Sequence, residues 1–275
     1  MMIVHKGSSR KEVIMDLGLT NKVALISGGS RGIGKGIAAA LLQEGCRIVI
    51  CARNNEQLQN AVKELKPSAT AAEGILPVQG DITRSGDVQR IIKSVIAEFG
   101  RIDILINNAG GNRRKLFEQT TDTDWQEILD LNLNAHIQLS RSVIPYMKEQ
   151  KQGVIVFISS IFGRESGGTT LSIYNTTKSA LISLAKIMAV ELAPFGIRVN
   201  SIAPGSIRFA GGSWDERVKK DPQGLAEFIK REMPLGRFGT VEEVANVVTF
   251  LVSEKASLVT GACINIDGGQ SRSLI

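Results

Sequence analysis

Two side chains with complementary chemistry lie four residues apart in a segment with a helical pattern. Tyr174 and Lys178 share one face of the helix expected over Ser172–Leu192, because residues i and i+4 are neighbours on an α-helix. A tyrosine phenol titrates near pH 10, too high for a base at neutral pH. A nearby ammonium stabilises the phenolate and lowers that pKa, so the pair predicts acid–base chemistry. The pair is weak evidence for a catalytic site by itself, since this spacing is common on solvated helices.

A serine follows one of the apolar runs. Val154–Ile158 is continuously apolar, typical of a strand buried on both faces, and Ser160 comes shortly after it. A hydroxyl at a strand end can hydrogen-bond a substrate oxygen. Serine is also a common turn residue, so Ser160 supports a catalytic site only together with other motifs.

A run of small residues lies between the first expected strand and the first expected helix. It reads Ser27-Gly-Gly-Ser-Arg-Gly-Ile-Gly34. Glycine lets the backbone turn sharply and approach a phosphate, and the free N–H groups at a helix N-terminus attract an anion. Glycines also serve ordinary turns, but the strand–loop–helix context favours dinucleotide binding. The expected cofactor contacts in this loop are Gly28, Ser30, Arg31, Gly32, Ile33 and Gly34.

The second expected strand ends at Cys51-Ala-Arg-Asn54. Folds that select NAD often place an acidic residue here to hold the ribose hydroxyls, whereas this segment offers Arg53. Together with Arg31, Arg53 favours a 2′-phosphate and therefore NADP(H) over NAD(H). The alternative is that both arginines are exposed charges on a basic protein.

Short apolar runs alternate with longer helical segments from Lys22 onward. Such βα repeats predict a parallel sheet with helices on both faces and a ligand site at the carboxyl ends of the strands. The seven expected strands are Val23–Ile26, Arg47–Cys51, Ile75–Val78, Ile102–Ile106, Val154–Ile158, Val199–Ile202 and Ile264–Ile266. The expected helices are Ile33–Gln43, Asn55–Leu65, Val88–Phe99, Asp124–Lys148, Ser172–Leu192 and Val241–Leu251. Because no linker divides the chain, we predict a single-domain, doubly wound α/β Rossmann fold.

The composition excludes several classes of protein. The 275 residues carry a formal net charge of +6, but the charges are scattered, so we expect no nucleic-acid partner. No apolar run approaches the roughly 18 residues that cross a bilayer, and the three cysteines show no paired spacing. We therefore expect a cytoplasmic protein without a membrane partner. With only His5 and His136, we expect no metal site.

Further motifs occur in the order and spacing of a known family. They are Gly28/Gly32/Gly34, Asp81, Asn107-Asn-Ala-Gly110, Asn132, Ser160, Tyr174/Lys178 and Pro204-Gly205. Each is modest, but the ordered set is specific and runs from about Leu19 to Asp267-Gly-Gly269. On these residues the chain resembles the short-chain dehydrogenases/reductases.

The resemblance implies a role for each matched residue. Tyr174 is the expected acid/base, and Lys178 is expected to lower its pKa and to bond the nicotinamide ribose. Ser160 is expected to orient the substrate oxygen, and Asn132 to hold a water in a proton relay. The remaining expected contacts are Asp81 and Ile82 at the adenine, Asn108, Ala109 and Gly110 beside the adenosine ribose, and Pro204, Gly205 and Ile207 at the nicotinamide.

Three segments depart from the family pattern or vary within it. Ser27 stands where a threonine more usually opens the glycine loop, which keeps the hydroxyl. The family often has a threonine shortly after the Pro-Gly pair, whereas this chain continues Ser206-Ile-Arg-Phe-Ala-Gly-Gly-Ser213. The interval Gly163–Ile173 is rich in Gly, Ser and Thr, which suggests a mobile rim to the pocket.

A segment at about 206–232 is expected to cover the substrate. Gly211-Gly212 offers a hinge, and three aromatic residues, Phe209, Trp214 and Phe228, either close over an apolar group or pack the segment onto the body. The basic run Arg113-Arg-Lys115 lies near the expected pocket mouth. It is either a solvated loop or, as a hypothesis, a surface that attracts an acidic acyl carrier or coenzyme A.

These observations favour an NADPH-dependent reductase of a ketone, with a 3-oxoacyl thioester as the expected substrate, as in the family's 3-oxoacyl-acyl-carrier-protein reductases. The alternative is an NAD(P)-dependent dehydrogenase of a small alcohol or sugar acid. A non-catalytic NADP-binding regulator is a third interpretation, against which the intact Ser160, Tyr174 and Lys178 argue. The resemblance also implies a homotetramer. Residues 1–14 are expected to be a disordered, dispensable extension before a family domain over 15–275.

Overall fold

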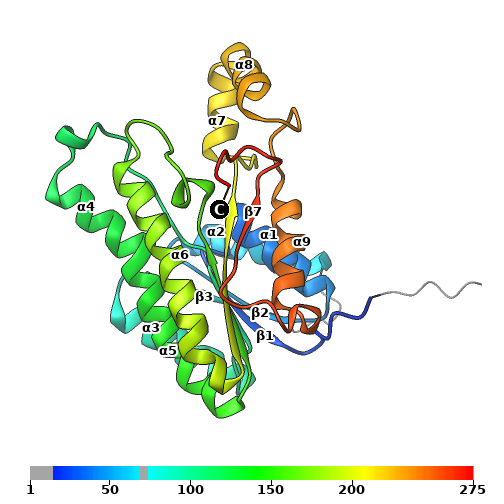
Figure 1. Cartoon of the computed structure of the whole chain (residues 1–275). Helices are drawn as coiled ribbons and strands as arrows, with labels where there is room; N and C mark the ends of the chain where they lie inside the picture. Colours follow the sequence, from blue (N-terminus) through cyan, green and yellow to red (C-terminus); the bar gives the residue numbers. More distant parts are fainter. Residues whose placement is uncertain (1–14, 69–73, 275) are drawn as a thin grey trace, which may run out of the picture.

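Seven parallel strands form one sheet in the order β3-β2-β1-β4-β5-β6-β7 (Figure 1). The computed structural model describes residues 15–68 and 74–274, so the extension expected over 1–14 lies outside the described residues. The strands are β1 Val23–Ser27, β2 Arg47–Ala52, β3 Ile75–Gln79, β4 Ile104–Asn107, β5 Gly153–Ile158, β6 Ile197–Pro204 and β7 Cys263–Ile266. The strand order reverses between β1 and β4, which pair as Ala24 with Ile104, and a crevice for a ligand forms beyond such a point. The predicted fold class is confirmed.

Helices cover both faces of this sheet (Figure 1). One face carries α1, α2 and α9, and the other carries α3, α5 and α6. The helices are α1 Gly32–Gln43, α2 Asn55–Leu65, α3 Ser85–Phe99, α4 Asp122–Leu129, α5 Ala135–Gln150, α6 Ser172–Leu192, α7 Ser213–Lys220, α8 Pro222–Glu232 and α9 Val241–Val252. Within the described ranges, no helix is both long and apolar enough to cross a membrane.

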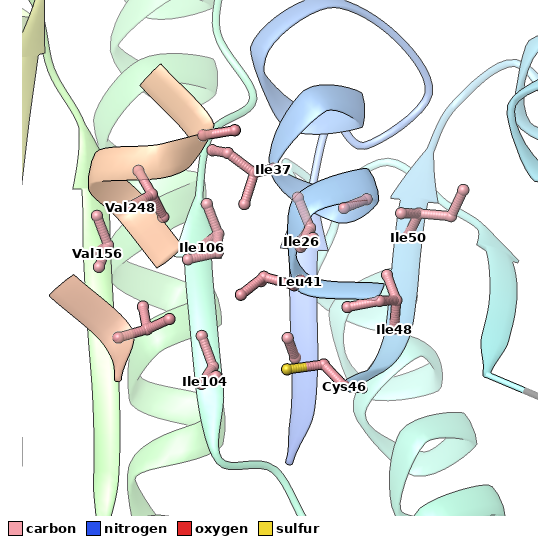
Figure 2. Close-up of a cluster of buried hydrophobic side chains, with 14 of the residues drawn as sticks. Ile26, Ile37, Leu41, Cys46, Ile48, Ile50, Ile104, Ile106, Val156 and Val248 are labelled. Atoms are coloured by element: carbon pink, nitrogen blue, oxygen red, sulfur yellow. The ribbon is translucent and has the colours of Figure 1, made fainter. Parts of the chain in front are cut away.

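The strands have apolar side chains on both faces, as their sequences predict. In β1, Ala24 and Ile26 join the cluster under α1 and α9, whereas Val23 and Leu25 join the cluster under α3, α5 and α6. Figure 2 shows the first cluster, in which side chains from β1, β2, β4 and β5 meet those of α1 and α9. Successive residues of a strand point to opposite faces, so each strand contributes to both clusters and is held in place from both sides.

The helix expected over Asp124–Lys148 is unbroken but is not α-helical throughout. It consists of α4 and α5 joined by a π-helical turn at Asp130–Asn134. A π turn inserts one residue into the helix and shifts the side chains that follow, and the apolar period alone does not reveal it. The other element boundaries differ from the predicted ones by a few residues at most.

Two helices stand apart from the sandwich. α7 and α8 project beyond the carboxyl end of β6 (Figure 1). Trp214 of α7 holds this lobe together, with its ring 5.0 Å from Phe228 of α8 and 5.2 Å from Phe238, measured between centroids. The lobe returns to the sandwich through α9, whose N-terminus has a capping box formed by Thr240 and Glu243.

Candidate active site

The loop between β1 and α1 requires glycine for two different reasons. Gly28 and Gly32 have positive φ angles of 65° and 54°, a backbone conformation that residues other than glycine rarely adopt. Gly34 has no room for a side chain, because a Cβ there would lie 2.5 Å from the carbonyl oxygen of Gly28. The loop therefore brings its backbone close to whatever binds above it.

The N-terminus of α1 is suited to a phosphate. Arg31 precedes the helix in an extended conformation, and its side chain makes no capping hydrogen bond. The first turn, which begins at Gly32, contains no acidic residue, and all of it lies in the described chain. Its N–H groups and the positive end of the helix dipole thus face the loop, an arrangement that binds anions.

A cavity of about 410 Å³ lies over this loop. It is bounded on its far side by the ends of β2 and β3 and by the segment after β4. Phe209, Gln57 and Leu131 also line it, and the sequence analysis had not assigned any of them to this cavity. The expected cofactor contacts that line it are Gly28, Ser30, Arg31, Gly32, Ile33, Arg53, Asp81, Ile82, Asn108, Ala109 and Gly110.

The glycine loop and the segment after β4 are fastened to each other. The Ser27 hydroxyl accepts hydrogen bonds from the backbone N–H groups of Asn108 (2.9 Å) and Ala109 (3.2 Å). In return, the Asn108 amide donates to the carbonyl oxygens of Ser27 (2.9 Å) and Gly28 (3.1 Å). Because a hydroxyl suffices for these bonds, the change from the more usual threonine to Ser27 leaves this contact intact.

A second cavity, of about 700 Å³, holds the expected catalytic groups. Ser160, Tyr174 and Lys178 all line it. Three expected nicotinamide contacts, Pro204, Gly205 and Ile207, line it as well. The residues that border both cavities are Arg31, Ile33, Asn108, Gly110 and Phe209. The two cavities therefore adjoin, and one extended ligand can reach from the glycine loop to Tyr174.

Burial dominates the ionisation of the Tyr174–Lys178 pair. Lys178 is 4% exposed, and burial lowers its pKa to about 8. Its ammonium donates a hydrogen bond to the Ile158 carbonyl oxygen (2.7 Å) and lies 5.7 Å from the centroid of the Tyr174 ring. Burial raises the pKa of Tyr174, which hydrogen bonding to Ser160 and the charge of Arg114 lower in part. The structure thus differs from the expectation that Lys178 lowers the pKa of Tyr174, because the ammonium is directed to Ile158 and desolvation of the phenol has the larger effect.

Asn132 lies behind the cavity and does not line it. Its side chain is fully buried in the π-helical turn. The amide accepts a hydrogen bond from the Gly111 N–H (2.8 Å) and donates to the Gly111 carbonyl (3.0 Å) and to the Thr177 hydroxyl (3.1 Å). Both ends of the amide are therefore occupied by protein groups, and Asn132 joins the wall after β4 to α6.

His136 supports the same wall from behind. The buried imidazole Nε2 lies 2.8 Å from the Ala109 carbonyl oxygen, to which it donates in the matching tautomer. Burial, together with the charge of Lys178, lowers the pKa of His136 to about 3. The histidine is therefore neutral, and its hydrogen bond holds the wall after β4 in place.

The aromatic residues of the covering segment divide between the two expected functions. Phe209 and Trp214 line the catalytic cavity. Phe228 does not line it and stacks on Trp214 instead. Phe209 also lies against the glycine loop, since a Cβ on Gly32 would be 2.6 Å from its ring. The lobe is thus both packed internally and open to a ligand on one side.

The basic run at the mouth contains three differently placed cations. Arg113 pairs with Glu127 (2.8 Å) and Lys115 with Asp124 (2.6 Å). Arg114 instead lines the catalytic cavity. Arg217 of α7 lines the same cavity, and the sequence analysis missed it because nothing in its local pattern distinguishes it from other basic residues of the lobe.

Comparisons with known proteins agree with this geometry. A family model described as Enoyl-(Acyl carrier protein) reductase matches residues 28–271. The 3-oxoacyl-[acyl-carrier-protein] reductase of Thermotoga maritima is 36% identical over 255 residues, which are 91% of this chain and 98% of that protein. The protein of the same name from Staphylococcus epidermidis is 34% identical over 254 residues, covering 90% and 98%. The solved structure of L-sorbose reductase from Gluconobacter frateurii, complexed with NADPH and L-sorbose, is 34% identical with a TM-score of 0.89, covering 94% of this chain and 100% of that one.

Proposed function

The chain belongs to the short-chain dehydrogenase/reductase family and is an oxidoreductase of C=O and CH–OH groups, and we propose that it reduces a 3-oxoacyl thioester with NADPH. One observation carries the proposal. Ser160, Tyr174 and Lys178 line a cavity that adjoins the cavity over the glycine loop. The relatives named for this reaction match over nearly their whole length, which supports the choice of substrate.

The residues of the first cavity fit NADP(H). The α1 N-terminus and the glycine backbone suit the pyrophosphate, and Arg31 before α1 and Arg53 after β2 offer two cations to the same cavity. Asp81 and Ile82 lie where the adenine contacts are expected. When bound, NADPH supplies the hydride. A relative of known structure was solved with NADPH, which supports this preference.

The proposed mechanism assigns the proton to Tyr174. Ser160 and Tyr174 orient the carbonyl oxygen of the substrate, and the Tyr174 hydroxyl donates its proton as an alkoxide develops there. The raised pKa of Tyr174 keeps the phenol protonated at neutral pH, which is the state that reduction requires. Lys178 places a positive charge beneath the ring, and Asn132 holds the wall and α6 in register.

A second candidate substrate is a polyhydroxylated ketone or its acid. The observation in its favour is the L-sorbose reductase structure, which this chain matches with a TM-score of 0.89. NADPH oxidation, followed with acetoacetyl-coenzyme A and with L-sorbose, separates the two candidates. We expect faster turnover with the thioester. The proposal fails if no carbonyl compound supports NADPH oxidation, or if Tyr174→Phe retains full activity.

Arg53 provides a test of the cofactor preference. Arg53→Ala removes a cation from the proposed 2′-phosphate site, so the KM for NADPH should rise by about tenfold or more while the KM for NADH stays unchanged. Arg47→Ala, at the opposite end of β2, is the matched control and should alter neither value. Equal losses with both cofactors would place the 2′-phosphate elsewhere.

We also infer a cytoplasmic homotetramer. Cys46, Cys51 and Cys263 are free thiols, which suits a reducing compartment. Two apolar side chains of α6, Ile187 and Val190, are 55% and 67% exposed, which favours burial of this helix against another copy of the chain. Light scattering of the purified protein tests the assembly, and a monomeric mass would contradict it.

A further inference from the structure

The charged side chains that line the catalytic cavity are all positive. Four cationic side chains line it, namely Arg31, Arg114, Lys178 and Arg217, and no carboxylate of the described residues does. Arg31 also borders the first cavity, where it is proposed to meet the cofactor, and Lys178 is proposed to serve catalysis. Neither Arg114 nor Arg217 is among the residues proposed to contact the cofactor or to transfer the proton.

Neighbouring cations in the same two segments are neutralised. Beside Arg114, both Arg113 and Lys115 have carboxylate partners. In the lobe, Arg208 and Lys219 share the buried carboxylate of Asp215, at 3.0 and 2.8 Å.

The two arginines that face the cavity differ from these neighbours. Within residues 15–68 and 74–274, no carboxylate lies within ion-pair distance of Arg114 or Arg217. The Arg217 guanidinium instead lies 4.4 Å from the centroid of the Trp214 ring, a cation–π contact beside the cavity.

Arg114 and Arg217 also line the same cavity, so both face the space that one ligand would occupy. Burial, and after it the charge of Arg217, lowers the pKa of Arg114, and the charge of Arg114 offsets part of the burial that raises the pKa of Tyr174. One arginine belongs to the body of the protein and the other to the α7–α8 lobe. Two like charges that face one cavity repel each other, and an anion placed between them removes the repulsion and draws the lobe to the body.

We propose that Arg114 and Arg217 form a subsite for an anionic group of the carbonyl substrate. The inference rests on the proposed reductase function and specifies its substrate class as a ketone that also bears a carboxylate or a phosphate. A free keto acid and the phosphate-bearing arm of a thioester are the two sources of that anion. Arginine binds carboxylate and phosphate through paired N–H donors, so the subsite accepts either group.

Two matched pairs of ligands test the subsite without requiring turnover. The first is 4-oxopentanoate against its methyl ester, and the second is acetoacetyl-coenzyme A against acetoacetyl-N-acetylcysteamine. Calorimetry on the full chain saturated with NADP⁺ gives the Kd of each ligand. The variants are Arg114→Gln and Arg217→Gln. The matched controls, each removing one charge in the same segment outside the cavity, are Arg113→Gln and Lys220→Gln.

We expect the wild type to bind the anionic member of one pair at least about tenfold more tightly than its neutral counterpart. Arg114→Gln and Arg217→Gln should both remove this preference without weakening the neutral ligand, and the controls should retain it. The pair that shows the effect identifies the source of the anion. The subsite is refuted if the wild type shows no preference for the anionic ligand in either pair. It is also refuted if the preference survives in both arginine variants, or if those variants lose neutral and anionic binding equally. Discrimination without NADPH oxidation would refute the reductase function and leave the subsite standing.

Discussion

The buried ammonium of Lys178 links catalysis to stability. The folded protein holds this group at a pKa of about 8, against an ordinary value of 10.5. Between these two pH values the unfolded chain binds a proton that the folded chain does not, so the contribution of Lys178 to the free energy of unfolding rises with pH across that window. At neutral pH the buried Lys178 ammonium is charged and lowers the stability of the fold. The proposed chemistry uses this charge, so stability is lost in favour of function.

Lys178→Met removes this dependence. Between pH 7 and pH 10, Lys178 should raise the free energy of unfolding of the wild type by about 2–3 kcal/mol, a rise that the variant lacks. The difference in stability between variant and wild type should therefore shift by that amount in favour of the wild type. Urea denaturation at both pH values measures the difference, with the exposed Lys220→Met as the control. A stability difference that does not change with pH would show that Lys178 is solvated in the folded state.

Single residues also mark where sequence analysis reaches its limit. The motifs correctly brought Ser160, Tyr174 and Lys178 to one cavity, because their spacing relative to strand and helix ends determines where they lie. The direction of the Tyr174 pKa was not predictable, since burial depends on segments far away in the chain. The shared position of Arg114 and Arg217 was not predictable either, because it depends on how the α7–α8 lobe sits over the sheet.

At the level of elements, the π-helical turn between α4 and α5 has a structural purpose. It turns Asn132 toward Gly111 and Thr177, so one side chain connects the cofactor wall to the helix that carries Tyr174. Such turns occur frequently at functional sites. Apolar periodicity placed the strands and the helices of the sandwich within a few residues but did not predict α7 and α8. It also could not indicate a one-residue insertion whose reason is a tertiary hydrogen bond.

Asn132→Ala should weaken both the fold and the reaction. The change leaves the part-buried N–H of Gly111 without its acceptor, which costs about 1–3 kcal/mol. Asn134→Ala in the same turn removes only an exposed bond to Asp130 and should stay within about 0.5 kcal/mol of wild type. Chemical denaturation and kcat measure the two effects. If both variants behave alike, the turn itself and not the Asn132 amide holds the wall.

Across the whole molecule, the α7–α8 lobe and the sandwich are separate in their packing. In the described chain, neither apolar cluster of the sandwich includes a residue between Ile207 and Val241. The lobe is held instead by Trp214 and its two ring partners. The function of the lobe can therefore be changed without unfolding the sheet.

Trp214→Ala should affect mainly substrate binding, whereas Phe157→Ala should affect mainly stability. Trp214→Ala loosens the cavity wall and should raise the KM for the carbonyl substrate several-fold, with little change in the Tm of the main transition. Phe157 is fully buried in β5, so Phe157→Ala should cost about 3–5 kcal/mol of unfolding free energy. Calorimetry and steady-state kinetics compare them. A large fall in Tm for Trp214→Ala would show that the lobe folds as part of the sandwich.

The position of β1 in the sheet has a consequence during synthesis on the ribosome. β1 pairs with β2 on one side and with β4 on the other, as Val23 with Arg47 and Ala24 with Ile104. At about 5–20 residues per second, translation from Ala24 to Ile104 takes roughly 4–16 s. For that time the nascent chain carries β1 with one hydrogen-bonding edge open, and such an edge can pair with other chains. Added chaperones should therefore improve the yield of folded protein by protecting this edge until β4 emerges.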